Sequence, residues 1–141
     1  MMPGKFKGEL SLTWLNKTWW RIDHPITYTT AAGEKYLVHK GLITDLGSIP
    51  RGLWNILHRS EFAPAYVIHD MLYSVKLVNR READRILNEA IYTLTAGDAT
   101  GKRAMIWLAV RLFGGWAWRK ARLKPVGKKR PKRTVPRLPA P

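Results

Sequence analysis

The spacing of hydrophobic residues changes once along this chain of 141 residues, and the change limits the folds open to it. Before residue 44 apolar and polar residues alternate, as in Leu10, Leu12 and Trp14, which is typical of strands with one buried face. From Pro50 onward the pattern instead predicts helices. Strands followed by helices predict an α+β fold.

The strand region predicts an antiparallel meander of about three strands, at residues 9–15, 20–28 and 35–43. The segment T-A-A-G-E at 30–34 predicts a turn between the last two. Three to four helices follow, at residues 50–57, 63–77, 79–96 and 102–113, the last continuing through two glycines to residue 118. Asn79 and Glu82 predict a capping box at the start of the third.

Charge divides the chain into a predicted domain, residues 1–118, and a C-terminal arm, residues 119–141. The arm contains ten Lys or Arg and no acidic residue, whereas the first 118 residues hold 15 basic against 10 acidic groups. Its prolines, at positions 125, 131, 136, 139 and 141, prevent a continued helix. We therefore expect an extended, basic arm that contacts other molecules.

Composition excludes several classes of protein. The chain has no cysteine, so disulfide scaffolds, thiolate metal sites and cysteine nucleophiles are excluded. The longest apolar run, residues 104–110, is too short to span a bilayer, and the first residues lack the apolar run of a signal peptide. The basic and apolar residues of the last helix are not cleanly segregated, so membrane-surface binding is not expected.

The best functional lead is a polar stripe on an otherwise apolar helix. His69 and Asp70 lie within A-P-A-Y-V-I-H-D-M-L-Y, and helical spacing places them with Tyr66 and Tyr73. Burying an imidazole or a carboxylate is costly unless the group is paired, so the stripe predicts a partner, a metal or a functional site.

Four sequence blocks lie in order between residues 44 and 118. They are T-D-x-x-S-x-P (Thr44, Asp45, Ser48, Pro50), H-D-x-L-Y (His69, Asp70, Leu72, Tyr73), R-x-x-A-D (Arg81, Ala83, Asp84) and A-V-R-x-x-G-G-x-x-W (Ala109, Val110, Arg111, Gly114, Gly115, Trp118). With these blocks the chain resembles, over roughly residues 4–118, a phage and prophage domain family of unknown function, family 1353. The resemblance implies a phage or prophage origin and brings no activity with it.

The H-D-x-x-Y block is also locally similar to the central helix of secreted phospholipase A2. That resemblance implies that His69 acts as base and Asp70 as metal ligand, with Tyr73 and Asp84 as orienting groups. It departs from those enzymes because this chain lacks their cysteine scaffold and glycine-rich calcium loop.

Three interpretations of the polar residues stay open. They form a buried structural network, a ligand-binding site without turnover, or a site for a divalent metal, calcium or zinc, whose candidate ligands are Asp45, His69, Asp70 and Asp84. An enzyme built on this site would be a metal-dependent hydrolase of a lipid or peptidoglycan bond.

The prediction for the whole chain is a phage virion or virion-associated structural protein, a tail or head-tail component made in the host cytoplasm. Its basic arm would contact other phage structural proteins or copies of itself. Non-specific contact with nucleic acid would use the cations Lys128, Lys129, Arg130, Lys132 and Arg133.

Overall fold

A computed structural model of the chain describes residues 1–16, 19–44 and 62–123. Short antiparallel strands occupy the first part and helices the second, which confirms the predicted α+β class. The helix predicted at residues 50–57 lies outside the described residues.

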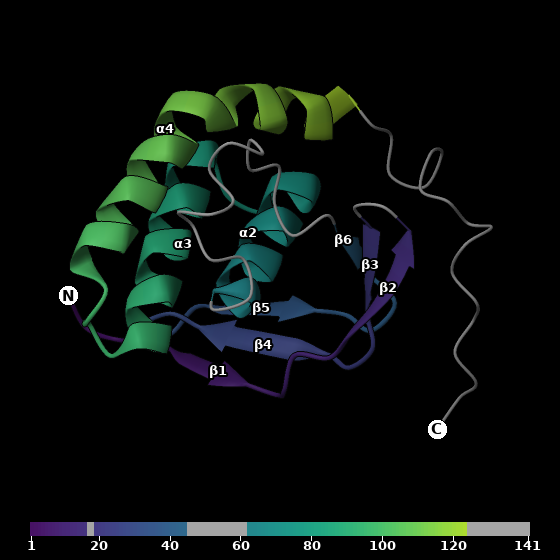
Figure 1. The fold of residues 1–141 in the computed structure, drawn as a ribbon, viewed down its shortest axis with the longest axis horizontal. Coiled ribbons are helices and arrows are strands. Elements are labelled where there is room, and N and C mark those ends of the chain that lie inside the picture. The colour runs from purple at the N-terminus through teal and green to yellow at the C-terminus, as the bar shows by residue number, and fades with distance from the viewer. Residues whose placement is uncertain (17–18, 45–61, 124–141) are drawn as a thin grey trace.

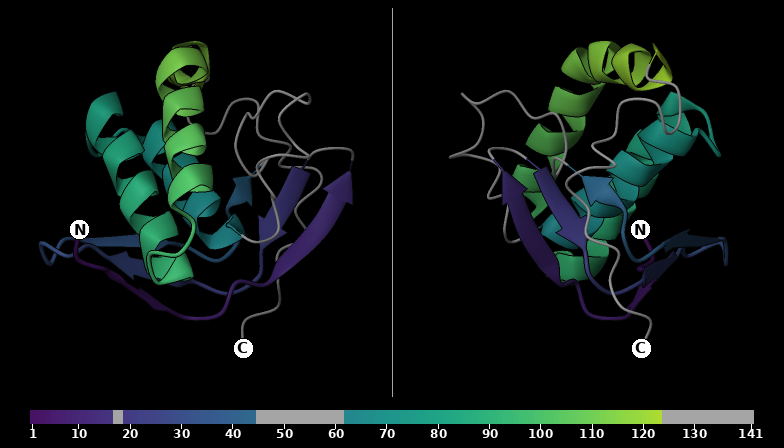
Figure 2. Two further views of the ribbon diagram at one scale, coloured as in Figure 1. Left: turned by 60° about the vertical axis from the view of Figure 1, so that its left-hand side comes forward. Right: turned by 90° about the vertical axis from the view of Figure 1, so that its right-hand side faces the viewer.

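The strands form two small sheets rather than one meander. The first sheet has the order β1-β4-β5, with β1 (Lys5–Lys7), β4 (Ile26–Thr29) and β5 (Lys35–Val38). The second has the order β2-β3-β6, with β2 (Leu12–Asn16), β3 (Trp19–Ile22) and β6 (Ile43–Thr44). All neighbours are antiparallel, and the two sheets stand at an angle to each other (Figure 2).

The described strands number six instead of about three because two predicted strands divide between the sheets and because β1, at residues 5–7, was not predicted. Residues 20–28 break at Pro25, which cannot donate to a ladder, so β3 and β4 join different partners. Residues 35–43 break near Gly41, whose φ of 91° is unsuited to a strand. The predicted turn at 30–34 is confirmed, because the Thr30 N–H donates to the Glu34 carbonyl at 2.8 Å.

Three helices follow within the described residues: α2 (Ala63–Val75), α3 (Arg80–Thr95) and α4 (Thr100–Leu123). The predicted cap of α3 is confirmed, since Asn79 Oδ1 accepts from the Glu82 N–H at 2.9 Å. Helices α2 and α3 each end at a left-handed residue, Lys76 with φ 56° and Ala96 with φ 50°.

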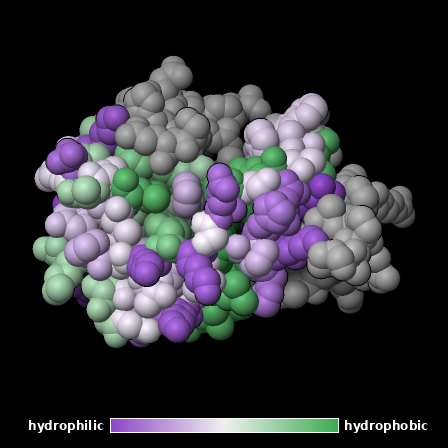
Figure 3. All heavy atoms as spheres, turned by 90° about the horizontal axis from the view of Figure 1, so that it is seen from below, coloured by the Kyte–Doolittle hydropathy of each residue, from purple (hydrophilic) through white to green (hydrophobic). Residues whose placement is uncertain are grey.

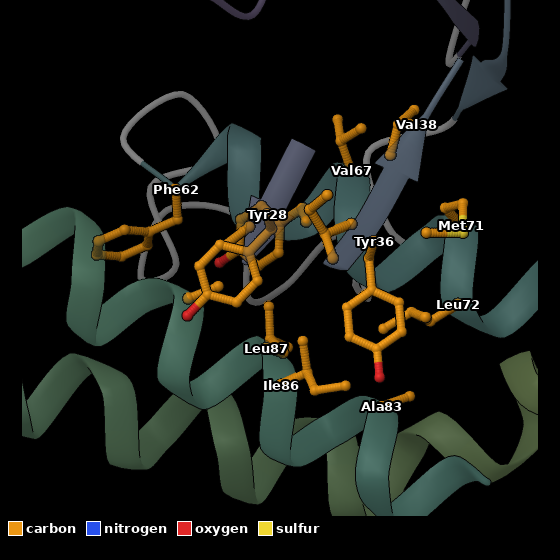
Figure 4. Packing of buried hydrophobic residues seen from close by; sticks show 14 of the residues in the cluster. Tyr28, Tyr36, Val38, Phe62, Val67, Met71, Leu72, Ala83, Ile86 and Leu87 are labelled. Atoms are coloured by element: carbon orange, nitrogen blue, oxygen red, sulfur yellow. The ribbon is translucent and has the colours of Figure 1, made fainter. Parts of the chain in front are cut away.

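The core lies between the first sheet and the helices, which cover one face of that sheet (Figure 1). Alternate residues of β4 and β5, among them Tyr28 and Val38, point toward α2 and α3, where they meet Val67 and Ile86 (Figure 4). Each large apolar side chain removed from water here contributes about 1.5–3 kcal/mol. Helix α2 contacts β5, β6, α3 and α4, and so occupies the centre of the molecule.

Helix α4 does not stop at the glycines. It runs up beside α3, turns, and continues across the top of the molecule to Leu123 (Figure 1). Residues 119–123, which the sequence assigned to the arm, are therefore helical. The boundary of the domain at residue 118 stays a prediction, and the cations at 128–133 lie outside the described residues.

Candidate functional site

A fully buried carboxylate, Asp84 on α3, is the centre of a polar cluster. Its Oδ1 atom lies 2.8 Å from His69 Nε2 and accepts a hydrogen bond of 2.6 Å from the Tyr73 hydroxyl. His69 and Tyr73 occupy consecutive turns of α2, with ring centroids 4.1 Å apart. The structure therefore brings together the histidine, the tyrosine and the aspartate that the phospholipase resemblance grouped.

Two arginines neutralise the other carboxylate oxygen. Arg111 on α4 donates from Nη1 to Asp84 Oδ2 at 2.7 Å, and Arg80, one turn before Asp84, places Nε 3.9 Å from the same oxygen. The side chains of Arg80 and Arg111 keep 24% and 29% exposure, whereas Asp84 has none. The buried negative charge is thus paired, and the cluster reaches solvent through its cations.

The electrostatics of the cluster favour an ionised aspartate. Burial alone would raise the pKa of Asp84, but hydrogen bonds from His69, Tyr73 and Arg111, with the charge on His69, hold it below its usual 3.8. Burial, followed by the hydrogen bond to the Asp84 carboxylate, raises the pKa of Tyr73. Tyr73 therefore remains a neutral donor.

This pairing selects one tautomer of the histidine. An ionised Asp84 accepts a hydrogen bond, so in neutral His69 the proton lies on Nε2 and the lone pair on Nδ1. Within the described part of the chain no hydrogen bond involves Nδ1. The arrangement is chemically able to accept a proton at that atom.

The same cluster holds the turn in α4. Arg80 Nη2 donates to the carbonyls of Val110 and Arg111 at 2.9 and 2.7 Å, and those carbonyls belong to the turn before Gly114 and Gly115. A side chain inserted at a glycine pair is an established cause of helix bending. A Cβ atom at Gly114 would lie 2.7 Å from the Tyr73 hydroxyl, so a larger residue at this position would have to displace Tyr73.

Lys76 and Trp118 close the end of the cluster. Lys76 Nζ donates to the carbonyls of Tyr73 and Trp118 at 2.8 and 3.0 Å and lies 3.7 Å from the centroid of the Trp118 ring. The Trp118 ring packs edge-on against Tyr73 at 5.0 Å. The second half of α4 is thereby attached to the end of α2.

Asp70 faces a different element from His69. Its Oδ2 accepts a hydrogen bond of 2.7 Å from the Thr44 hydroxyl on β6, whereas His69 points to α3. The described residues contain no group of three or more His, Asp or Glu side chains able to share a metal ion. Asp45 lies outside the described residues, so the four-ligand metal site stays a prediction.

Other residues of the four sequence blocks lie away from the Asp84 cluster or outside the described residues. Ser48 and Pro50 of the first sequence block lie outside the described residues, and Arg81 of the third block is exposed. The role of Arg111 was not predicted. Its only signal in the sequence was the A-V-R block before the glycine pair, and linear spacing does not show which acid an arginine on the next helix will contact.

Fold and cluster together define a small α+β domain whose three described helices converge on one paired aspartate. The chain belongs to the family described as "Protein of unknown function (DUF1353)", whose model matches residues 20–110, more than half of the sequence. No curated protein and no solved structure matches it. None of its described helices is long and apolar enough to cross a membrane.

Proposed function

We propose that this chain is a virion-associated structural or accessory protein of a phage, whose domain is attached to a larger assembly by its basic C-terminal region. The phage origin is what the four sequence blocks imply. The attachment is supported by the charge distribution, because all ten acidic residues precede residue 99 while 13 of the 25 Lys and Arg follow it. Such a region suits an acidic surface of other phage proteins, or nucleic acid.

In this proposal the role of the Asp84 cluster is structural. It joins α2, α3 and α4 through a single carboxylate, and so fixes the helix from which the basic region extends. A paired polar cluster of this kind specifies one arrangement of the helices around it. The protein would be made in the host cytoplasm and carried in the mature particle.

Truncation after Leu123 should separate attachment from folding. We expect the shortened chain to keep its melting temperature, because α4 remains complete, and to be lost from particles purified on a density gradient. A chain of full length with Lys128, Lys129, Arg130, Lys132 and Arg133 replaced by Gln should behave like the truncation if charge is responsible. Normal incorporation of both variants would contradict the proposal.

A second candidate function, a hydrolase acting on a lipid or peptidoglycan bond, is favoured by one observation. His69 is oriented by Asp84 through Nε2 and leaves the Nδ1 lone pair for a water molecule. Transfer of a water proton to Nδ1 would leave hydroxide to attack an ester or amide carbon, and the same proton would pass to the leaving alcohol or amine as the C–O or C–N bond breaks. Calcium or zinc bound by Asp70 and Asp45 would stabilise the oxyanion that forms.

This activity is tested by incubating the purified chain with phospholipid micelles or peptidoglycan, with calcium or zinc and after chelation. His69→Ala should lower product release by about 100-fold or more, the usual contribution of a general base. His24→Ala, at an exposed position on the same chain, should leave it unchanged. If no product forms and metals do not shift the melting temperature, while His69→Ala lowers stability, the cluster is structural only.

A further inference from the structure

Helix α4 has two apolar faces, and only one of them is used by the domain. Ile106, Val110, Ala117 and Trp118 pack against the core. The helix also exposes apolar residues, five of which we call the outer face: Met105, Leu108, Leu112, Phe113 and Trp116. Trp107 is exposed too, at 43%, but its helical spacing separates it from these five. Large apolar side chains that gather on an exposed surface mark interaction sites, so the outer face indicates a partner.

The spacing of the outer face is helical. Its first four members recur at intervals of three, four and one residues, which places them on one side of the first half of α4, and Trp116 follows directly after the turn at the glycine pair. Leu112 is 66% exposed, Phe113 57% and Trp116 63%. By contrast, the surface seen from below the first sheet mixes hydrophilic and hydrophobic residues (Figure 3).

The structure separates the charges that the sequence appeared to mix. Arg111 turns inward to Asp84, and Arg103 lies over the Tyr92 ring, 4.8 Å from its centroid, so neither belongs to the outer face. Exposed cations remain at its two ends, Lys102 and Arg119. The apolar surface is thus flanked by positive charge.

Any partner of the outer face must be compatible with the positive charge beside it. No acidic residue follows Asp98, while 13 Lys and Arg do. A second copy of the chain would bring two such basic segments together, and like charges repel. The occupant therefore offers both an apolar interior and negative charge.

We propose that the outer face of α4 docks onto an anionic lipid bilayer, lying in the interface with its apolar side chains among the acyl chains. Trp and Phe with Leu on one side of a helix are the composition of interfacial helices, and Trp favours the level of the headgroups. The Lys and Arg near the end of α4 supply the second signal, electrostatic attraction to anionic headgroups, that stable docking requires. This inference is independent of the virion role and of any hydrolysis at His69.

The test is co-sedimentation of the full chain with vesicles of phosphatidylglycerol and phosphatidylethanolamine, compared with vesicles of phosphatidylcholine. We expect binding to the anionic vesicles that weakens with salt. Leu112→Glu, which removes an apolar contact and adds a repelled charge, should weaken it by about tenfold or more. The matched control is Leu37→Glu on β5, since Leu37 is also exposed, at 44%, but lies away from α4.

Both variants should keep the melting temperature of the parent, because neither position is buried. Equal binding of the parent and Leu112→Glu would show that charge alone attracts the chain, and would overturn the proposal, as would absence of binding. So would a dimer of the parent, seen by size-exclusion chromatography without lipid, that Leu112→Glu converts to a monomer. Loss of binding in Leu112→Glu with retained binding in Leu37→Glu would support it.

Discussion

Asp84→Asn is expected to lower the free energy of unfolding by about 3 kcal/mol or more, the usual cost of removing one partner from a buried ion pair. The change keeps the shape of the side chain but removes the charge that pairs with Arg111. It also introduces an amide NH₂ where the carboxylate now accepts from donors on both oxygens. At least one donor of the cluster is then left without an acceptor, and equilibrium urea unfolding measures the cost.

The matched control is Asp98→Asn, the same chemical change at an exposed acid between α3 and α4. Exposed charges contribute little to stability, so this variant should lie within about 0.5 kcal/mol of the parent. Equal stabilities of the two variants would mean that the cluster does not hold the helices together. The proposed structural role would then be lost.

The same pair of variants gives a pH dependence with a defined sign. The pKa of Asp84 in the folded chain is below its usual 3.8, so its ionised form is favoured by folding. The contribution of ionised Asp84 to the free energy of unfolding is fully present above about pH 4, and it is lost as the pH falls through the lower pKa of the folded chain. The stability difference between parent and Asp84→Asn should therefore shrink on acidification, whereas that for Asp98→Asn should stay near zero.

The fold class was predictable because periodicity of two and of about 3.6 are local properties. The cap at Asn79 was predictable for the same reason. The division into two sheets was not, since Pro25 and Gly41 could equally have marked bulges within longer strands. Which strand pairs with which depends on packing beneath α2, far along the chain.

The candidate site, too, was predictable from the sequence only where local spacing determines it. The i and i+4 spacing of His69 and Tyr73 on α2 predicted their common direction, and the resemblance supplied Asp84 as a group that orients His69. The hydrogen bond from Tyr73 to Asp84 was not predicted. Asp70, next to His69 in the sequence, was grouped with it but contacts Thr44 instead, because adjacent helical residues point about 100° apart. Arg111 lies beside Asp84 because of the course that α4 takes over the domain, and no spacing in the sequence indicates that course.

Gly114→Ala is expected to destabilise the domain by about 2 kcal/mol, the range for adding a methyl group to a filled space. Alanine ordinarily stabilises a helix relative to glycine, so this sign opposes propensity. The added Cβ would lie 2.7 Å from the Tyr73 hydroxyl. That hydroxyl cannot move freely, since it donates to Asp84 while its ring lies against His69 and Trp118.

Gly115→Ala is the control for this change, because its Cβ would meet Arg80 at 3.5 Å, an ordinary contact. Helix propensity should then make Gly115→Ala neutral or stabilising by up to about 1 kcal/mol. Equal effects at the two glycines would show that the general flexibility of the pair, rather than the contact with Tyr73, determines stability.

A double variant isolates the contact further. Tyr73→Phe removes the obstructing oxygen, so Gly114→Ala should cost less in the Tyr73→Phe background than in the parent. The remaining neighbour, Arg80 Nη2 at 3.5 Å, is at an ordinary distance. A coupling energy near zero, measured by urea unfolding of all four proteins, would mean that α4 does not rest on Tyr73. A positive coupling energy would show that glycine is needed at position 114 because of the Tyr73 hydroxyl. Since that hydroxyl also donates to Asp84, the course of α4 would then depend on the Asp84 cluster.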